Sequence, residues 1–234
     1  MKLIRHVFLS SIGKKYIMAV TGLFLFLFVV GHMIGNLQIF LGAEPINRYA
    51  HFLQSLGELL WVIRLSLLGI IALHIWSAIA LTLENRAARP VAYATRDGYA
   101  ASYASRTMIL SGFIIAAFVV YHLLHYTVKA PVSLTGQDFH ALPLYTLHSG
   151  TKVPDVYRMM IVGFSQPVVA IFYIIAVSLL SFHLGHGVAA LFQSLGLKSQ
   201  AWTPVIEKFG AIAAWVLAIG YASIPASVLF GLVK

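Results

Sequence analysis

The sequence contains no cysteine, and charged residues make up only 10% of its 234 positions. The absence of cysteine excludes disulfides, thiolate zinc sites and iron–sulfur clusters held by this chain. Charge is scarce while 60% of the residues are hydrophobic. A soluble chain of this length has too little interior to hide that much apolar surface. The sequence therefore predicts an integral membrane protein.

Acidic residues are also few, with seven carboxylates against 16 lysines and arginines and a net charge of +9. The basic residues are scattered at the ends of apolar runs rather than gathered in one stripe. That distribution is typical of anchoring at a membrane interface, whereas a nucleic-acid surface concentrates its cations. We therefore expect no nucleic-acid partner.

Five apolar runs are long enough to cross about 30 Å of hydrocarbon as helices. They cover residues 16–41, 59–83, 107–130, 157–192 and 204–233. The fourth run is long for one span, and Gln166 and Pro167 near its start predict a bend. No connection is long enough to form a second domain, the longest being 131–155. We predict an all-α integral membrane fold with one transmembrane domain, residues 1–234, whose first four helices form a haem-binding bundle.

The distribution of basic residues predicts the orientation of the chain. With the N-terminus in the cytoplasm, ten of the 16 lie inside: Lys2, Arg5, Lys14, Lys15, Arg86, Arg89, Arg96, Arg106, Lys198 and Lys208. Cytoplasmic segments carry the excess of lysine and arginine, so the N-terminus is predicted inside and the C-terminus outside. Residues 1–15 show no signal-peptide cleavage site, so we expect the first run to remain as the first span.

Four histidines lie within these apolar runs, one in each of four separate runs: His32, His74, His122 and His183. A polar imidazole in hydrocarbon is costly enough that it usually has a functional partner. His32 and His122 lie 16 and 15 residues past the starts of their runs, or about 23 Å from the inner surface. His74 lies 10 residues before Glu84 and His183 lies 10 before Gln193, so both are about 15 Å from that surface. Depth therefore predicts two pairs.

Each predicted pair joins two helices at one level, which is the arrangement that a haem b with two axial imidazoles requires. Zinc is disfavoured because the chain has no cysteine and no carboxylate lies beside the four histidines. Gly31 and Gly35 flank His32 and would leave clearance for a macrocycle. The same G-x-x-x-G spacing also marks close helix packing, so that interpretation stays open.

Two of the histidines belong to H-x-x-H pairs, His122 with His125 and His183 with His186. Residues three apart share a broad helix face. Either member could therefore bind iron while the other contacts a propionate, a quinone or water, and spacing alone leaves the choice open.

Several stretches of the sequence carry a family resemblance. They are SSIGKKYIMAVTG (10–22), GHMIGNLQIF (31–40), YAHFLQSLGELLW (49–61), LHIWSAIALTLENRAARPVAY (73–93) and FHLGHGVAALFQSLGL (182–197). Together they resemble the cytochrome b subunit of succinate dehydrogenase and fumarate reductase, in its five-helix, two-haem, single-chain form. The match runs through the first four helices and is strongest in ENRAARP and around the histidines.

The resemblance implies a quinone-binding electron-transfer subunit in the cytoplasmic membrane of a prokaryote, surrounded by lipid. Its cytoplasmic face would dock on an iron–sulfur subunit that binds a flavoprotein, and these partners would hold the iron–sulfur clusters, the FAD and the dicarboxylate catalysis. Two b haems here would connect them to menaquinone or ubiquinone. The family's ligand positions fall on His32, His74, His122 and His183, paired as His32 with His122 and His74 with His183. The direction of electron flow and an oligomer of the whole complex are left open.

A quinone site would need a proton donor or acceptor beside a hydrophobic ring. Glu58, at the outer mouth of the second helix, is the best candidate, with His51 as a weaker companion. The alternative interpretation of Glu58 is a solvated carboxylate that the helix dipole stabilises. A second candidate site lies at the inner mouth, at Ser11 and Lys14, where basic residues could equally contact a partner or lipid headgroups.

Two other functions are compatible with the sequence. A different dihaem cytochrome b, such as that of a hydrogenase or formate dehydrogenase, would hold similar haems and dock other partners. A proton or ion transporter would use the buried histidines as a relay, although such proteins normally carry intramembrane carboxylates as well.

Overall fold

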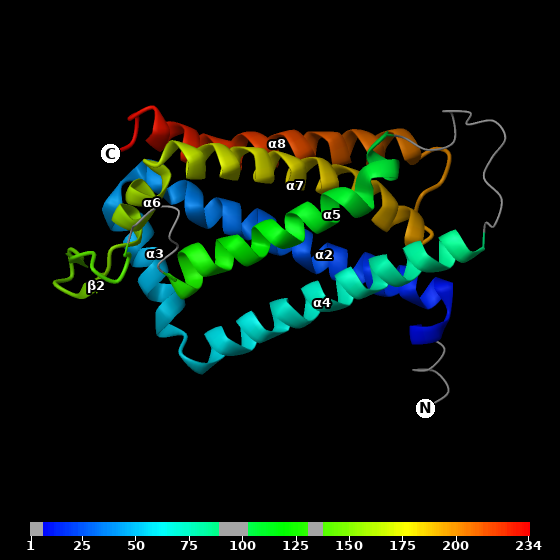
Figure 1. The fold of residues 1–234 in the computed structure, drawn as a ribbon, viewed down its shortest axis with the longest axis horizontal. Helices are drawn as coiled ribbons and strands as arrows, with labels where there is room; N and C mark the ends of the chain where they lie inside the picture. Colours follow the sequence, from blue (N-terminus) through cyan, green and yellow to red (C-terminus); the bar gives the residue numbers. More distant parts are fainter. Residues whose placement is uncertain (1–6, 89–102, 131–137) are drawn as a thin grey trace. The chain divides into compact units, whose positions relative to one another are not determined.

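The computed structural model describes residues 7–88, 103–130 and 138–234 of the chain (Figure 1). Five helices within these residues are long and apolar enough to cross a membrane. They are α2 (Ser11–Asn36), extended by the 3-10 helix η1 (Leu37–Leu41), α4 (Glu58–Ala87), α5 (Tyr103–His122), extended by the π-helix η2 (Leu123–Val128), α7 (Pro167–Ser194) and α8 (Thr203–Leu229). The prediction of five long apolar helices is confirmed.

The fourth predicted run is wrong as a single helix, and the bend predicted near its start is confirmed. A short helix, α6 (Val156–Phe164), ends at Ser165, and α7 begins afresh at Pro167. Proline lacks a backbone N–H and has a fixed φ, so it suits the first position of a helix and disfavours continuation from the preceding turn. The membrane-length helix of this segment is therefore α7 alone.

The third helix changes its winding toward its end. The α-helical pattern of α5 stops at His122, and the wider π-helical turn η2 follows. Lys129 then adopts the left-handed conformation, with φ 56°, and its N–H bonds to the carbonyl of Leu124. The helix thus ends at Val128, two residues before the predicted end, because a left-handed residue cannot continue a right-handed helix.

Two elements outside the long helices were not predicted. The amphipathic helix α3 (Ala43–Ser55) follows η1, and the strands β1 (Leu144–Thr146) and β2 (Lys152–Pro154) form an antiparallel hairpin in which Tyr145 faces Val153. Helix α3 packs against η1, β2 and α6. Figure 1 shows α3, α6 and β2 close together.

Asn47 holds this group together. It lies on α3 with none of its surface exposed, and its side-chain oxygen accepts the backbone N–H groups of Val156 at 2.7 Å and Tyr157 at 3.1 Å. Its amide nitrogen donates to Asp155 at 3.0 Å. Asp155 in turn caps α6 by accepting the N–H of Arg158. In the first turn of α6, two donors are therefore satisfied by Asn47 of α3 and a third by the cap residue Asp155.

The chain divides into two compact units, and each of the five long helices has one part in the first unit and the other part in the second. The first unit comprises Met1–Phe28, Arg64–Phe113 and Ser181–Trp215, and the second comprises Val29–Ile63, Ile114–Leu180 and Val216–Lys234. In the first unit α7 and α8 approach closely, since a Cβ on Gly210 would lie 2.6 Å from the carbonyl oxygen of Gly185. In the second unit the core gathers around Phe118, Phe164 and Tyr173.

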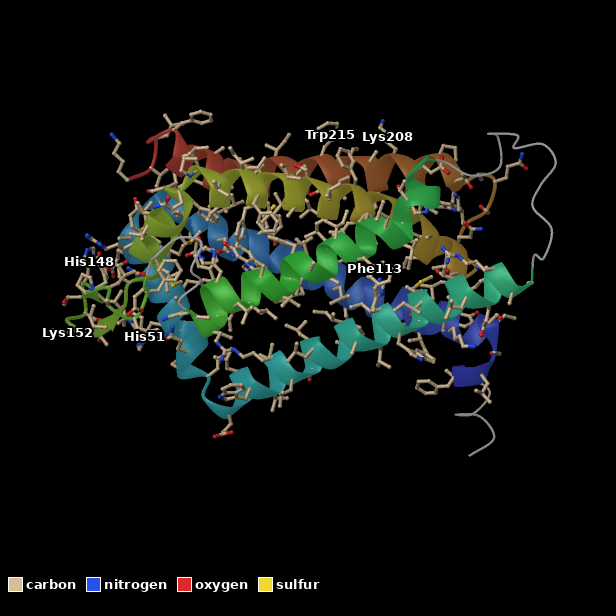
Figure 2. The ribbon with its side chains drawn as sticks, viewed as in Figure 1. His51, Phe113, His148, Lys152, Lys208 and Trp215 are labelled. Atoms are coloured by element: carbon tan, nitrogen blue, oxygen red, sulfur yellow. The ribbon has the colours of Figure 1, made fainter. Side chains whose placement is uncertain are left out.

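Large apolar side chains are exposed along all five long helices. On α8, for example, Trp215 is 60% exposed. Figure 2 shows Trp215 and Lys208 projecting outward from that helix. Extensive apolar exposure of this kind is typical of helices that face lipid.

Candidate functional site

The first unit contains His74, on α4, and His183, on α7, within electrostatic reach of each other. Each imidazole is held at its Nδ1 atom by a hydroxyl from another helix. Thr21, on α2, lies 3.0 Å from Nδ1 of His74, and Ser111, on α5, lies 3.1 Å from Nδ1 of His183. The structure thus brings together the pair that helix depth predicted for the inner level.

The hydrogen bonds of these hydroxyls determine which ring nitrogen carries the proton. Thr21 donates its single proton to its own helix, with the carbonyl of Ile17 at 2.7 Å, and Ser111 does the same to Met108 at 3.0 Å. Both oxygens must therefore accept from the imidazoles, so His74 and His183 carry their protons on Nδ1. Their Nε2 atoms are left with a lone pair, which is the form of histidine that binds a metal through Nε2.

Small residues lie close to the same two rings. A Cβ on Gly22 would lie 3.3 Å from His74, and one on Gly112 would lie 3.7 Å from His183. The contact at Gly22 is tight, so the absence of a side chain there lets α2 approach His74 and brings Thr21 within hydrogen-bonding distance. A Cβ on Gly112 would make only an ordinary van der Waals contact, so the orientation of His183 rests on its hydrogen bond with Ser111.

The second unit brings together His32, on α2, and His122, the last residue of α5. Their ring centres are 5.7 Å apart and their planes are nearly perpendicular, at 82°. Two axial imidazoles on one metal, with each nitrogen about 2 Å from it and each ring centre about 1 Å further, place their ring centres roughly 6 Å apart. The observed spacing fits a shared ligand role, and this is the pair predicted for the outer level.

Aromatic side chains surround this second pair. Tyr221, on α8, lies 6.3 Å from His32 between ring centres and donates its hydroxyl to the carbonyl of Val29. The hydroxyl of Tyr173, on α7, is 3.4 Å from Nδ1 of His122. Gly35 does not supply clearance beside His32 in the way that its position suggested. A Cβ there would lie 2.6 Å from the ring of Tyr49, so Gly35 accommodates that side chain.

The structure places the alternative histidines differently from the paired ones. His125, on η2, is 2% exposed and packs against Tyr121, Tyr126, Phe139 and Tyr173 rather than against His32. His186, one turn beyond His183 on α7, lies within electrostatic reach of Lys198. In both H-x-x-H motifs it is therefore the first histidine that meets a histidine from another helix.

The donor set suits a haem better than a bare metal ion. Within residues 7–88, 103–130 and 138–234, no group of three or more histidine, cysteine, aspartate or glutamate side chains could hold a metal ion. A protein-bound zinc needs at least three such ligands, whereas a haem iron needs only two axial ones, because the macrocycle fills the other positions. Two pairs of imidazoles fit two haems.

The candidate quinone residues fall in different units. Glu58, in the second unit, is the exposed first residue of α4 and has no hydrogen-bond partner among the described residues. His51, also in the second unit, lies half-buried on α3. Figure 2 shows it at the same end as His148 and Lys152 of the hairpin.

Ser11 and Lys14, in the first unit, meet a residue that sequence reasoning missed. Ser11 donates to Glu84 at 2.9 Å, and Lys14, which is only 6% exposed, forms an ion pair with the same carboxylate. Lys14 also donates to the carbonyl of Leu9. Two of its three donors are thus used within the protein. Glu84 is the first residue of the ENRAARP stretch and lies three residues before the end of α4 at Ala87. An acidic residue at the end of an apolar run was the signal in the sequence that could have indicated a partner for Lys14. Arg89 and Arg96, which follow in the sequence, lie outside the described residues.

No known protein family matches this chain, and no curated protein or solved structure is significantly similar to it.

Proposed function

We propose that this chain is the membrane-anchor cytochrome b subunit of a succinate:quinone oxidoreductase, holding two b haems between four helices. The observation that carries the proposal is the pair of histidine pairs: His32 with His122 at 5.7 Å between ring centres, and His74 with His183, each held at Nδ1 by a hydroxyl. The sequence resemblance supplies the family, and the geometry supports the cofactor.

His32, His74, His122 and His183 would hold the haems, which would supply one-electron transfer. The protein contributes orientation and exclusion of water. Thr21 and Ser111 keep the Nε2 lone pairs of His74 and His183 available, and the aromatic residues around His122 keep water away from that end of the second unit. These roles require no movement of the helices.

Glu58 is our proposed proton acceptor or donor for quinone. It is exposed at the start of α4, where a membrane-dissolved ring could reach it, and no described residue competes for its carboxylate. Ser11 and Lys14 are weaker candidates because Glu84 already engages both of them. The Lys14–Glu84 ion pair is better suited to holding the start of α2 against the end of α4, beside the proposed iron–sulfur partner.

The first test is a dithionite-reduced minus oxidised spectrum of the purified protein, with haem quantified per polypeptide. We expect two b haems in the wild type and loss of one in each of His32→Ala, His74→Ala, His122→Ala and His183→Ala. The matched control His186→Gln is expected to keep both. A wild-type protein without haem would refute the cytochrome assignment and favour a transporter.

A second experiment separates this family from other dihaem cytochromes b. The tagged chain is purified from its native membrane in mild detergent, and the co-purifying complex is assayed for succinate-dependent reduction of a quinone analogue. Succinate-reducible haem is expected. Reduction by hydrogen or formate instead would assign the chain to another dehydrogenase.

A further inference from the structure

The proposed function leaves His125 without a role, although this histidine is among the most deeply buried polar residues of the second unit. It lies on the π-helical turn η2 and is 2% exposed. Its ring centre is 4.2 Å from that of Tyr126 and 5.2 Å from that of Phe139. A buried imidazole in such surroundings is costly unless its nitrogens are used.

The hydroxyl of Tyr173 joins His125 to His122. It lies 3.1 Å from Nδ1 of His125 and 3.4 Å from Nδ1 of His122. A phenol has one proton, so it can donate to one imidazole while it accepts from the other. This differs from Thr21 and Ser111, which donate to carbonyls of their own helices and can only accept from histidine.

The ligand role of His122 fixes the direction of this chain of hydrogen bonds. An imidazole that binds iron through Nε2 carries its proton on Nδ1, so His122 donates to the Tyr173 oxygen. The Tyr173 proton must then go to Nδ1 of His125. His125 is thereby neutral with its own proton on Nε2, the atom that has no hydrogen-bond partner among the described residues.

Resting on the function proposed above, we infer that Tyr173 is a positioning residue that holds His122 in its iron-binding tautomer, and that His125 sets the direction of the Tyr173 hydroxyl. Without His125, the Tyr173 proton would have His122 as its nearest acceptor. That bond would favour the tautomer with the proton on Nε2, where it blocks the metal. An imidazole held in the wrong tautomer loses its function even when its position is unchanged.

The arrangement offers a matched control in Tyr126. This tyrosine packs in the same cluster, 5.9 Å from Tyr173 between ring centres, but its hydroxyl has no hydrogen-bond partner among the described residues. Tyr126→Phe and Tyr173→Phe each remove one buried hydroxyl from the same surroundings. Only Tyr173→Phe removes a contact to an imidazole.

The experiment compares the purified full-length wild type, Tyr173→Phe, His125→Phe and Tyr126→Phe. Haem transfer to an excess of apomyoglobin and the midpoint potential of each haem are measured. We expect one of the two haems in Tyr173→Phe and His125→Phe to transfer about 10-fold to 100-fold faster, the usual cost of losing the partner of a metal-binding histidine. Its potential should also rise in Tyr173→Phe, because an imidazole without an acceptor donates less electron density.

Identical transfer rates and potentials in Tyr173→Phe and Tyr126→Phe would overturn the inference while leaving the proposed function intact. A wild type without haem would overturn both. If Tyr173→Phe loses both haems through misfolding, His125→Phe decides the question, because it retains the phenol. Unchanged transfer in that variant would then refute the role of His125 and with it the directed chain.

Discussion

Thr21→Val tests the hydrogen-bond argument at the first histidine pair. Thr21 is 6% exposed, and its oxygen accepts the Nδ1 proton of His74 across 3.0 Å. Valine has nearly the same shape and lacks the hydroxyl, so the substitution removes the side-chain acceptor of His74 and leaves only its backbone contact with Met18. The carbonyl of Ile17 loses the hydrogen bond from the Thr21 hydroxyl, but it keeps its main-chain hydrogen bond within α2.

The magnitude follows from the donor that is left behind. A buried N–H without a partner costs about 1–3 kcal/mol, and about 1.4 kcal/mol corresponds to a factor of ten in an equilibrium constant. The same free energy no longer favours the native ring orientation and the Nδ1 tautomer over a rotated imidazole and the tautomer with its proton on Nε2. We therefore expect haem affinity at the His74–His183 pair to fall about 10-fold to 100-fold, as at other metal-binding histidines that lose their acceptor.

The assay is haem transfer from the purified protein to excess apomyoglobin, followed by absorbance. Thr82→Val is the matched control. Thr82 lies on the same helix as His74 and donates to its own carbonyl, that of Ala78, at 2.7 Å, with no imidazole bond among the described residues. One of the two haems should transfer faster in Thr21→Val, and both should be retained in Thr82→Val. Equal rates in the two variants would refute the argument that the hydroxyl fixes the tautomer.

Three further substitutions test other contacts. Ser111→Ala should loosen the same haem as Thr21→Val in the apomyoglobin assay, whereas Ser178→Ala, whose hydroxyl bonds only its own helix among the described residues, should not. Glu84→Gln should lower the thermal unfolding temperature, because it leaves the buried ammonium of Lys14 without a counter-charge. Thermal unfolding in detergent measures this, and a larger loss in Lys14→Met would contradict it. Asn47→Ala should cost about 2–4 kcal/mol through three lost hydrogen bonds. Hydrogen exchange should rise first in the opening turn of α6, and unchanged protection there would contradict the capping role.

The sequence predicted the long helices well because their hydropathy is continuous over membrane length, a signal that tertiary contacts rarely override. It failed where the local winding depends on packing. The break before Pro167 was visible as a proline, but the π-helical turn at Leu123 has no such mark in the sequence. Helix α3 was missed because its apolar face is confined to one side and its average hydropathy is near neutral.

The hydroxyl partners of the histidines were missed for a specific reason. The first helix was predicted to start at Tyr16, after the lysines, whereas α2 begins at Ser11. Lys14 is tolerated inside it because Glu84 neutralises its charge. The hydrogen bond between Ser11 and Glu84 places these two residues at one level. Thr21 comes ten residues after Ser11, and His74 comes ten residues before Glu84 on the antiparallel helix α4, so Thr21 and His74 also meet at one level. The predicted start placed Thr21 too near the inner surface for that pairing.

The two H-x-x-H motifs differ in the hydroxyl that contacts their first histidine, which is that of Ser111 for His183 and that of Tyr173 for His122. The two hydroxyls differ in whether they can donate their own proton to a main-chain carbonyl of the same helix. Serine and threonine hydroxyls lie one bond from Cβ, so they can give their proton to a carbonyl of the preceding turn, as Ser111 does beside His183. The phenol oxygen of Tyr173 stands at the far end of a ring, and among the described residues its hydrogen bonds are to His125 and His122 rather than to a carbonyl. In the proposed arrangement His125 is that acceptor beside His122, whereas the Ser111 proton beside His183 already has a carbonyl acceptor. We therefore expect the second histidine of the motif to affect the first one on α5 and η2, and to be dispensable for it on α7.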